Sequence, residues 1–105
     1  MTTVDPDSIP TNWLVERVVD LAYESVLRSD LERAQLVDAD IEQMIAKAAS
    51  KGKKKWDEFI AGMHSGDELW FFRNSEDEWK SFSGREGYAI VRDGRIIAAG
   101  ITARS

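Results

Sequence analysis

Apolar residues cover most of a helical circumference over residues 13–28, and the polar residues fall on one stripe. That stripe consists of Glu16, Arg17, Asp20, Glu24 and Arg28. Pro10, Thr11 and Asn12 come just before it and supply the fixed φ and the side-chain oxygens typical of a helix start. We therefore expect a helix over residues 13–28 whose broad apolar face is buried in the core or also meets a partner. Residues 1–9 contain the Asp5-Pro6 step, are followed by Pro10, and are expected to form a flexible tail.

Two further sets of apolar residues recur at helical spacing before residue 64. They are Ile41, Met44, Ile45 and Ala48, and then Trp56, Phe59, Ile60 and Met63. Gly52 lies between the sets and costs about 1 kcal/mol relative to alanine inside a helix, which predicts a break or kink there. One continuous helix is also compatible with the pattern, because the two sets differ in phase by only about 60°.

Shorter signals mark the ends of these helical segments. A turn is expected through Leu31, Ala34 and Leu36, and the next helix is expected to begin after Asp38. Gly62 or Gly66 can end the helical half of the chain.

The last forty residues change character. Residues 68–73 are rich in aromatic side chains and predict a strand. Ser75 and Glu78 have the spacing of a capping box, which opens a short helix through Trp79 and Phe82 that Gly84 can close. Asp93-Gly94 separates two apolar runs and predicts a type I′ turn, so residues 88–102 are expected to form a β-hairpin.

These elements together predict an α+β fold. N-terminal helices would pack on a small three-stranded antiparallel sheet with a C-terminal β-hairpin. After the tail of residues 1–9, residues 10–105 are expected to form a single domain. Residues 10–63 would be helical, and residues 67–104 would form the strand, the short helix and the hairpin.

Composition excludes several classes of chemistry. The 105 residues include no cysteine and one histidine, which excludes disulfides, thiolate metal sites and centres that need two imidazoles. No apolar run approaches the length of a membrane span, and the first ten residues lack the charged start and apolar core of a secretory signal. A small acidic cytoplasmic protein is the expected class.

The net charge of −5 is unevenly distributed. Residues 1–50 carry ten acidic and four basic residues, whereas residues 51–105 carry nine acidic and ten basic ones. The acidic half repels phosphate backbones, so nucleic-acid binding is not expected to be the main function. The basic run at residues 51–56, which ends in Trp56, could contact phosphates and stack on a base. The favoured interpretation is a solvated helix junction, with Trp56 in the core.

Other polar groups do not predict catalysis or metal binding. Ser65, His64 and Asp67 are neighbours in the chain, whereas the members of a catalytic triad usually come from separate elements. Glu76, Asp77 and Glu78 fit the first turn of a helix, where carboxylates offset the dipole. We expect no catalytic residue, no metal ligand and no cofactor.

Four tryptophans are many for this length, and two of them flank one turn. Trp70 and Trp79 could line an aromatic groove with anion contacts from Arg73 and Arg85 at its rim, and Glu68 as a further polar contact. The same tryptophans could instead supply core area. The five residues are the candidate ligand-binding set.

The last predicted strand is apolar on both faces. Its candidate interface residues are Ile96, Ile97, Ala99 and Ile101. If this strand is a sheet edge, its free backbone groups invite a second chain, which would give a homodimer. If it is a central strand, the same residues are core.

The C-terminal segment resembles one that recurs in a family of small uncharacterised bacterial proteins. The shared pattern runs Gly66-Asp67-Glu68-Leu69-Trp70, Phe72, Trp79, Gly84-Arg85, Gly87-Tyr88, Val91-Arg92 and Gly94. The resemblance implies a bacterial origin and a helix–strand–helix–hairpin unit used as a module. Among its polar members, Glu68, Arg85 and Arg92 would serve a shared function or form a structural ion pair.

The expected function is protein binding without catalysis, in the manner of small accessory, immunity or inhibitor proteins, with self-association as a homodimer. The first alternative is a small-ligand or enzyme site in the groove near Trp70, Trp79 and Arg85. The second alternative is nucleic-acid binding through residues 51–56.

Overall fold

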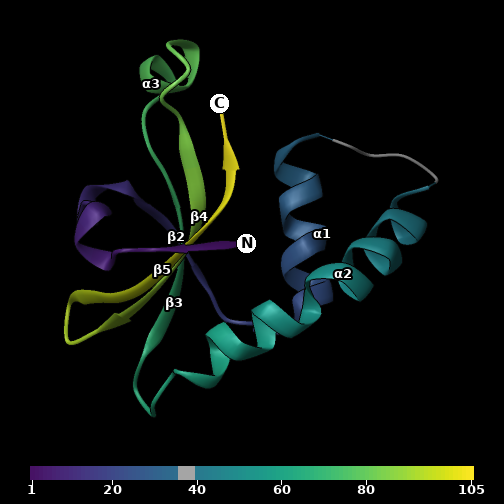
Figure 1. The fold of residues 1–105 in the computed structure, drawn as a ribbon, viewed down its shortest axis with the longest axis horizontal. Helices are drawn as coiled ribbons and strands as arrows, with labels where there is room; N and C mark the ends of the chain where they lie inside the picture. The colour runs from purple at the N-terminus through teal and green to yellow at the C-terminus, as the bar shows by residue number, and fades with distance from the viewer. Residues whose placement is uncertain (36–39) are drawn as a thin grey trace. The chain divides into compact units, whose positions relative to one another are not determined.

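The structure is a computed structural model that describes residues 1–35 and 40–105. These residues form two compact units, of which the first combines Met1–Val19 with Met63–Ser105 and the second is Asp20–Gly62. The first unit contains the strands and the second contains the two longer helices (Figure 1). The predicted α+β class is therefore confirmed.

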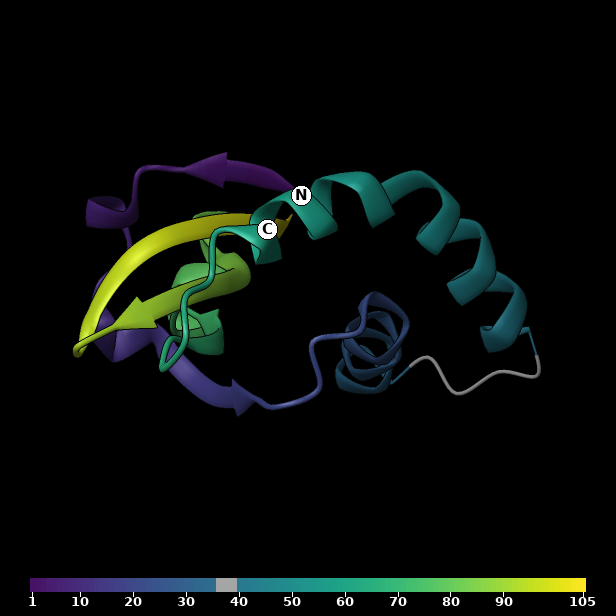
Figure 2. The ribbon, with the colours of Figure 1, turned by 90° about the horizontal axis from the view of Figure 1, so that it is seen from below.

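The first unit is built on one five-stranded antiparallel sheet. Its strands are β1 (Thr2–Val4), β2 (Leu14–Val18), β3 (Glu68–Arg73), β4 (Arg85–Arg92) and β5 (Arg95–Arg104). The strand order is β1-β5-β4-β3-β2. The prediction of three strands is wrong, because β1 pairs with the outer side of β5 and β2 pairs with the outer side of β3. Figure 2 shows β1 and β2 on opposite sides of the β4–β5 hairpin.

Both unexpected strands lie where the sequence predicted other structure. β1 lies in the segment expected to be a flexible tail, and β2 lies within the helix expected over residues 13–28. The helix in that region, α1 (Tyr23–Arg33), begins only at Tyr23. Five residues are too few for the sequence pattern to distinguish a helix from a strand, and the strand forms because β3 offers backbone partners.

The connection between β1 and β2 supplies core to one face of the sheet. It contains two short 3₁₀ helices, η1 (Pro6–Ser8) and η2 (Thr11–Trp13). Between them Ile9 is only 5% exposed, and it packs in a cluster with Phe72, Ala89, Ala99 and Ile101. The Trp13 ring stacks on Phe72 with the ring centroids 6.3 Å apart.

The opposite face of the same strands is also buried. Its fully buried members are Leu69, Phe71, Tyr88 and Ile90. The Phe71 and Tyr88 rings lie 5.7 Å apart across the β3–β4 pair. Burial on both faces explains why β3 and β4 read as continuous apolar runs rather than as alternating patterns.

The β4–β5 hairpin is confirmed. Asp93 and Gly94 connect the strands with φ values of 52° and 76°, the positive angles that a type I′ turn requires at both central positions.

The second unit pairs α1 with one long helix, α2 (Ile41–Ala61). α2 runs through Gly52 without the expected break. The Tyr23 and Trp56 rings stack 5.6 Å apart, and Trp56 Nε1 donates to the Leu21 carbonyl at 2.9 Å. The expected turn at Leu36 and helix start at Asp38 lie outside the described residues.

Candidate interaction site

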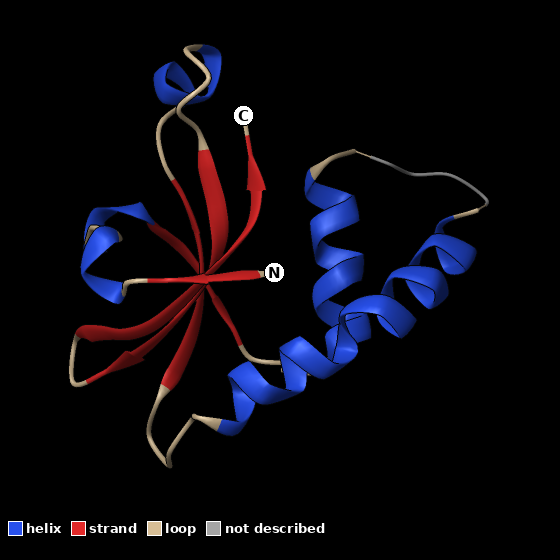
Figure 3. Cartoon of the chain, viewed as in Figure 1, coloured by secondary structure: helices blue, strands red, loops and turns tan. Residues whose placement is uncertain are grey.

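A short helix, α3 (Glu76–Lys80), and its following loop lie at one end of the sheet (Figure 3). The predicted capping box is confirmed, because Ser75 Oγ accepts from the Glu78 amide and a Glu78 carboxylate oxygen accepts from the Ser75 amide. The helix ends at Lys80 rather than at Phe82. We call residues 75–84 the Phe82 turn.

The end of α3 has the hydrogen bonds of a Schellman motif. The Ser83 amide donates to the Glu78 carbonyl at 2.8 Å, and the Phe82 amide donates to the Trp79 carbonyl at 3.4 Å. Phe82 thereby takes the position after the helix cap that is usually glycine, because the backbone there is left-handed. Its φ is 62°.

The Phe82 side chain is 84% exposed. A left-handed conformation costs an L-residue about 1–2 kcal/mol, and glycine avoids this cost. Burial of the ring gives almost no compensation within the chain. Local stability alone therefore disfavours phenylalanine at this position.

Buried contacts hold the Phe82 turn against the sheet. The Asn74 side chain is buried, donates to the Ser83 carbonyl at 3.0 Å and accepts from the Arg85 amide at 2.8 Å. The Trp79 ring packs so closely on Gly84 that a Cβ at that position would overlap it. Gly84 thus provides space for Trp79 and does not close the helix as expected.

The turn is acidic on its helical side. Glu76, Asp77 and Glu78 fill its first turn, and Lys80 is the basic residue of the last turn. The Arg73 guanidinium lies 4.5 Å from the Trp79 ring centroid and pairs with Glu76 at 3.1 Å. These contacts fix the base of the turn and leave Phe82 at its tip.

The structure divides the five candidate ligand-binding residues into separate groups. Trp70 Nε1 donates to Glu68 at 3.0 Å, and Arg17 Nη1 lies 3.6 Å from the other Glu68 oxygen. Trp70 occupies the register position opposite Ala89, on the face of the Phe72 core cluster.

Arg73 and Trp79 form the second group. Arg73 lies three residues from Trp70 along β3, and alternation of side chains places the two on opposite faces of the sheet. Arg85 donates to the neighbouring Gly84 carbonyl at 2.8 Å. A ligand-binding role for any of these residues stays a prediction.

A third polar group links the α2–β3 loop to β4. Asp67 accepts from Arg92 Nε at 2.8 Å and from Arg92 Nη2 at 2.7 Å, and its second oxygen also accepts from the His64 amide. These bonds lower the pKa of Asp67 to about 2, with the Arg92 hydrogen bonds the largest cause. Arg92 is thus in an ion pair, with Asp67 rather than with Glu68.

The candidate interface residues lie on β5, which is a central strand between β1 and β4. Ala99 and Ile101 pair with Val4 and Thr2 of β1 and are buried, so this stretch of β5 is not a sheet edge. Ile96 is half-buried against the Phe72 cluster, and Ile97 is also half-buried. A role in an interface stays a prediction for all four.

The basic run at residues 51–56 lies within α2. Trp56 is 2% exposed and therefore has no free face for a nucleic-acid base. Lys53 pairs with Asp57 at 2.7 Å. Across residues 1–35 and 40–105 the structure shows no group of three His, Asp or Glu side chains that could hold a metal ion. Within the same ranges, no helix has both the length and the apolar character needed to cross a membrane.

Comparison with protein families, curated proteins and solved structures finds no match to this chain. The resemblance of the C-terminal segment to small bacterial proteins stays a prediction.

Sequence reasoning missed Phe82 as an exposed side chain, because its spacing from Trp79 fits a buried helical stripe. One signal was available. The α3 segment from Ser75 is short, and Ser81 and Ser83 beside Phe82 favour loop over helix.

Proposed function

We propose that this chain is a protein-binding module without catalysis of its own and that Phe82 is its anchor. The observation that carries the proposal is a phenylalanine that is 84% exposed in a left-handed conformation at a glycine position. Exposed aromatic anchors on rigid supports are typical of interface hot spots. Strained backbone at a well-supported position is typical of functional sites.

The surroundings of Phe82 favour a partner of particular chemistry. An aromatic ring at the tip of a turn fits an apolar pocket, and the acidic residues of α3 fit a basic rim around that pocket. The partner is therefore a protein with an apolar pocket bordered by lysine or arginine.

Photo-crosslinking tests the proposal directly. With p-benzoylphenylalanine at position 82, in cells that naturally produce the chain, we expect one discrete crosslinked protein. Purified wild-type chain should compete for that product, whereas the Phe82→Ala chain should not. The same group at Thr102, an exposed β5 residue of the same unit, should give no such product. Absence of a specific product at position 82 would contradict the proposal.

Stability measurements test it without the partner. Phe82→Gly should raise the free energy of unfolding by about 0.5–1 kcal/mol, because glycine adopts positive φ without strain. Phe82→Ala keeps the Cβ and should give no such gain, so it is the matched control. If Phe82→Gly instead lowers the stability, the ring has a structural role and the proposal loses its support.

A further inference from the structure

One exposed face of α2 forms a shallow hollow that no part of the proposed function uses. Its volume is about 560 Å³, and it is lined by Ser50, Lys53, Lys54, Asp57, Glu58 and Ala61. These residues follow one another at the spacing of a single helical stripe. All six are exposed. We call this surface the α2 strip.

The order of charges in the α2 strip is the less stabilising of the two possible orders for an isolated helix. The lysines precede the acids, and a helix is better stabilised when the acid comes first. Asp57 and Glu58 also lie near the C-terminal end of Ile41–Ala61, where carboxylates oppose the helix dipole and where no basic residue occupies the last turn. Helix stability therefore does not account for this arrangement.

The charges of the α2 strip are complementary to those of a second copy that runs antiparallel to it. Its residues are symmetrically spaced about a point between residues 55 and 56, with lysines on one side and acids on the other. Two copies of α2 that run antiparallel about this point place Lys53 and Lys54 of each copy opposite Asp57 and Glu58 of the other. A two-fold interface requires such self-complementarity.

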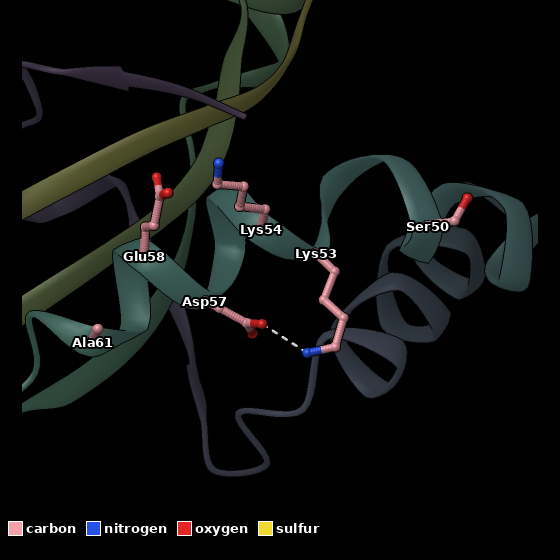
Figure 4. Close-up of a pocket in the computed structure, with 6 residues that line it drawn as sticks. All are labelled: Ser50, Lys53, Lys54, Asp57, Glu58 and Ala61. Carbon is pink, nitrogen blue, oxygen red and sulfur yellow. Dashed lines mark hydrogen bonds and ion pairs between the residues drawn. The ribbon is translucent and has the colours of Figure 1, made fainter.

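The four charged side chains form two rows along the helix, and both rows keep the pairing of lysine with acid between the two copies. In Figure 4, Lys53 and Asp57 point toward one flank and are joined by their ion pair, while Lys54 and Glu58 extend on the other flank. A two-fold axis perpendicular to the helix pair brings like flanks together. Each row then faces the same row of the other copy in the opposite direction, so that each lysine lies against an acid.

We infer that the α2 strip binds a second copy of this chain through antiparallel helix pairing. This self-association is independent of the partner proposed for Phe82. The strip is small and polar compared with a standard interface of roughly 1,200–2,000 Å², so the dimer is weak and salt-dependent.

The edge strand β2 is a poorer surface for a second copy. Antiparallel pairing of β2 with itself about its centre places Glu16 opposite Glu16 or Arg17 opposite Arg17. Like charges directly across a strand pair are destabilising. The charge pattern therefore favours α2.

Charge-reversal variants of the full chain test the inference by sedimentation velocity over a range of concentrations. We expect wild-type self-association to weaken at least about tenfold between low and high salt. Lys53→Glu/Lys54→Glu and Asp57→Lys/Glu58→Lys should each weaken it to a similar degree, because each strip becomes all of one sign. An equimolar mixture of the two variants should restore association as a heterodimer.

A matched control is available on the same helix. Lys51→Glu/Lys55→Glu makes the same change in net charge at exposed positions outside the α2 strip, and it should leave association unchanged. Circular dichroism confirms that each variant keeps its helices. A wild-type chain that is monomeric at millimolar concentration, or variants that associate like the wild type, would overturn the inference. So would a mixture that forms no heterodimer. Phe82→Ala should leave this association intact, which separates it from the proposed function.

Discussion

Gly52 lets the aromatic ring of Tyr23 approach the backbone of α2. A Cβ at this position would overlap the phenol of Tyr23, whose ring stacks on Trp56. Alanine is the better helix former by about 1 kcal/mol, but crowding in a packed site costs about 1–3 kcal/mol. We expect Gly52→Ala to lower the free energy of unfolding by about 1 kcal/mol, as measured by urea denaturation.

A double-mutant cycle with Tyr23→Phe isolates the cause. Removing the phenol oxygen relieves the closest overlap, so Gly52→Ala should cost less in the Tyr23→Phe background. Ser50→Ala, at an exposed position of the same helix, should change stability by less than about 0.5 kcal/mol. Equal costs in both backgrounds would show that Tyr23 is not the reason for glycine.

Phe82 and Gly84 exchange the roles that the sequence predicts for them. The residue with positive φ at the end of α3 is Phe82, and Gly84 is kept small by the Trp79 ring. The local sequence does not predict that Phe82, rather than Gly84, takes the positive φ. This exchange depends on where the Trp79 ring lies, and that ring packs against Arg73 of β3.

β2 is a segment whose apolar residues follow a helical pattern, although the segment forms a strand. As a helix over residues 13–28, the segment would place Leu14 and Val15 together on the apolar face. In the strand, Leu14 packs against the Phe72 cluster and Val15 is 60% exposed.

Truncation of these two side chains tests the strand. Leu14→Ala should lower the free energy of unfolding by about 1–2 kcal/mol, because a partly buried side chain loses its packing. Val15→Ala should change it by less than about 0.5 kcal/mol. Chemical denaturation measures both. Similar losses for the two variants would contradict the strand and favour the helix.

The elements that the sequence predicts well are those fixed by nearby residues. The capping box of α3 joins Ser75 to Glu78, and the hairpin turn depends on Asp93 and Gly94. β1 depends on pairing with Ala99–Ile101 at the other end of the chain. A pattern of three residues cannot predict pairing with a strand so far away in the sequence.

The acid stability of the whole molecule should depend on Asp67. Its carboxylate has a pKa lowered from 3.8 to about 2, first by the Arg92 guanidinium and then by the His64 amide. The folded state therefore binds fewer protons than the unfolded state in this range. The resulting stabilisation is complete above about pH 4 and is lost as the pH falls through about 2.

Asp67→Asn removes this contribution. We expect the wild-type free energy of unfolding to fall between about pH 4 and pH 2, and the variant to show a smaller fall over the same range. Urea denaturation at a series of pH values measures both curves. Asp7→Asn, at an exposed position, should follow the wild type. Parallel curves for wild type and Asp67→Asn would show that the ion pair does not stabilise the fold.

At the scale of the molecule, a ligand-binding role for the candidate site residues stays a prediction. The sequence singled out the residues around Trp70 and Trp79, and the structure holds them in two groups with different neighbours, Arg17 for one and Arg73 for the other. Alternation along β3 is the physical reason. Neighbours in the sequence of a strand point to opposite faces, so residues close in the chain need not share a site.

The amino-acid sequence alone determined the α+β class, the capped start of α3 and the β4–β5 turn, because helix caps and tight turns are stabilised within a few residues. Only the tertiary structure decided that residues 2–4 and 14–18 are strands, that α2 continues through Gly52, and that Phe82 projects into solvent. The two strands depend on contacts between residues far apart in the chain, and such contacts override weak local preferences of about 1 kcal/mol.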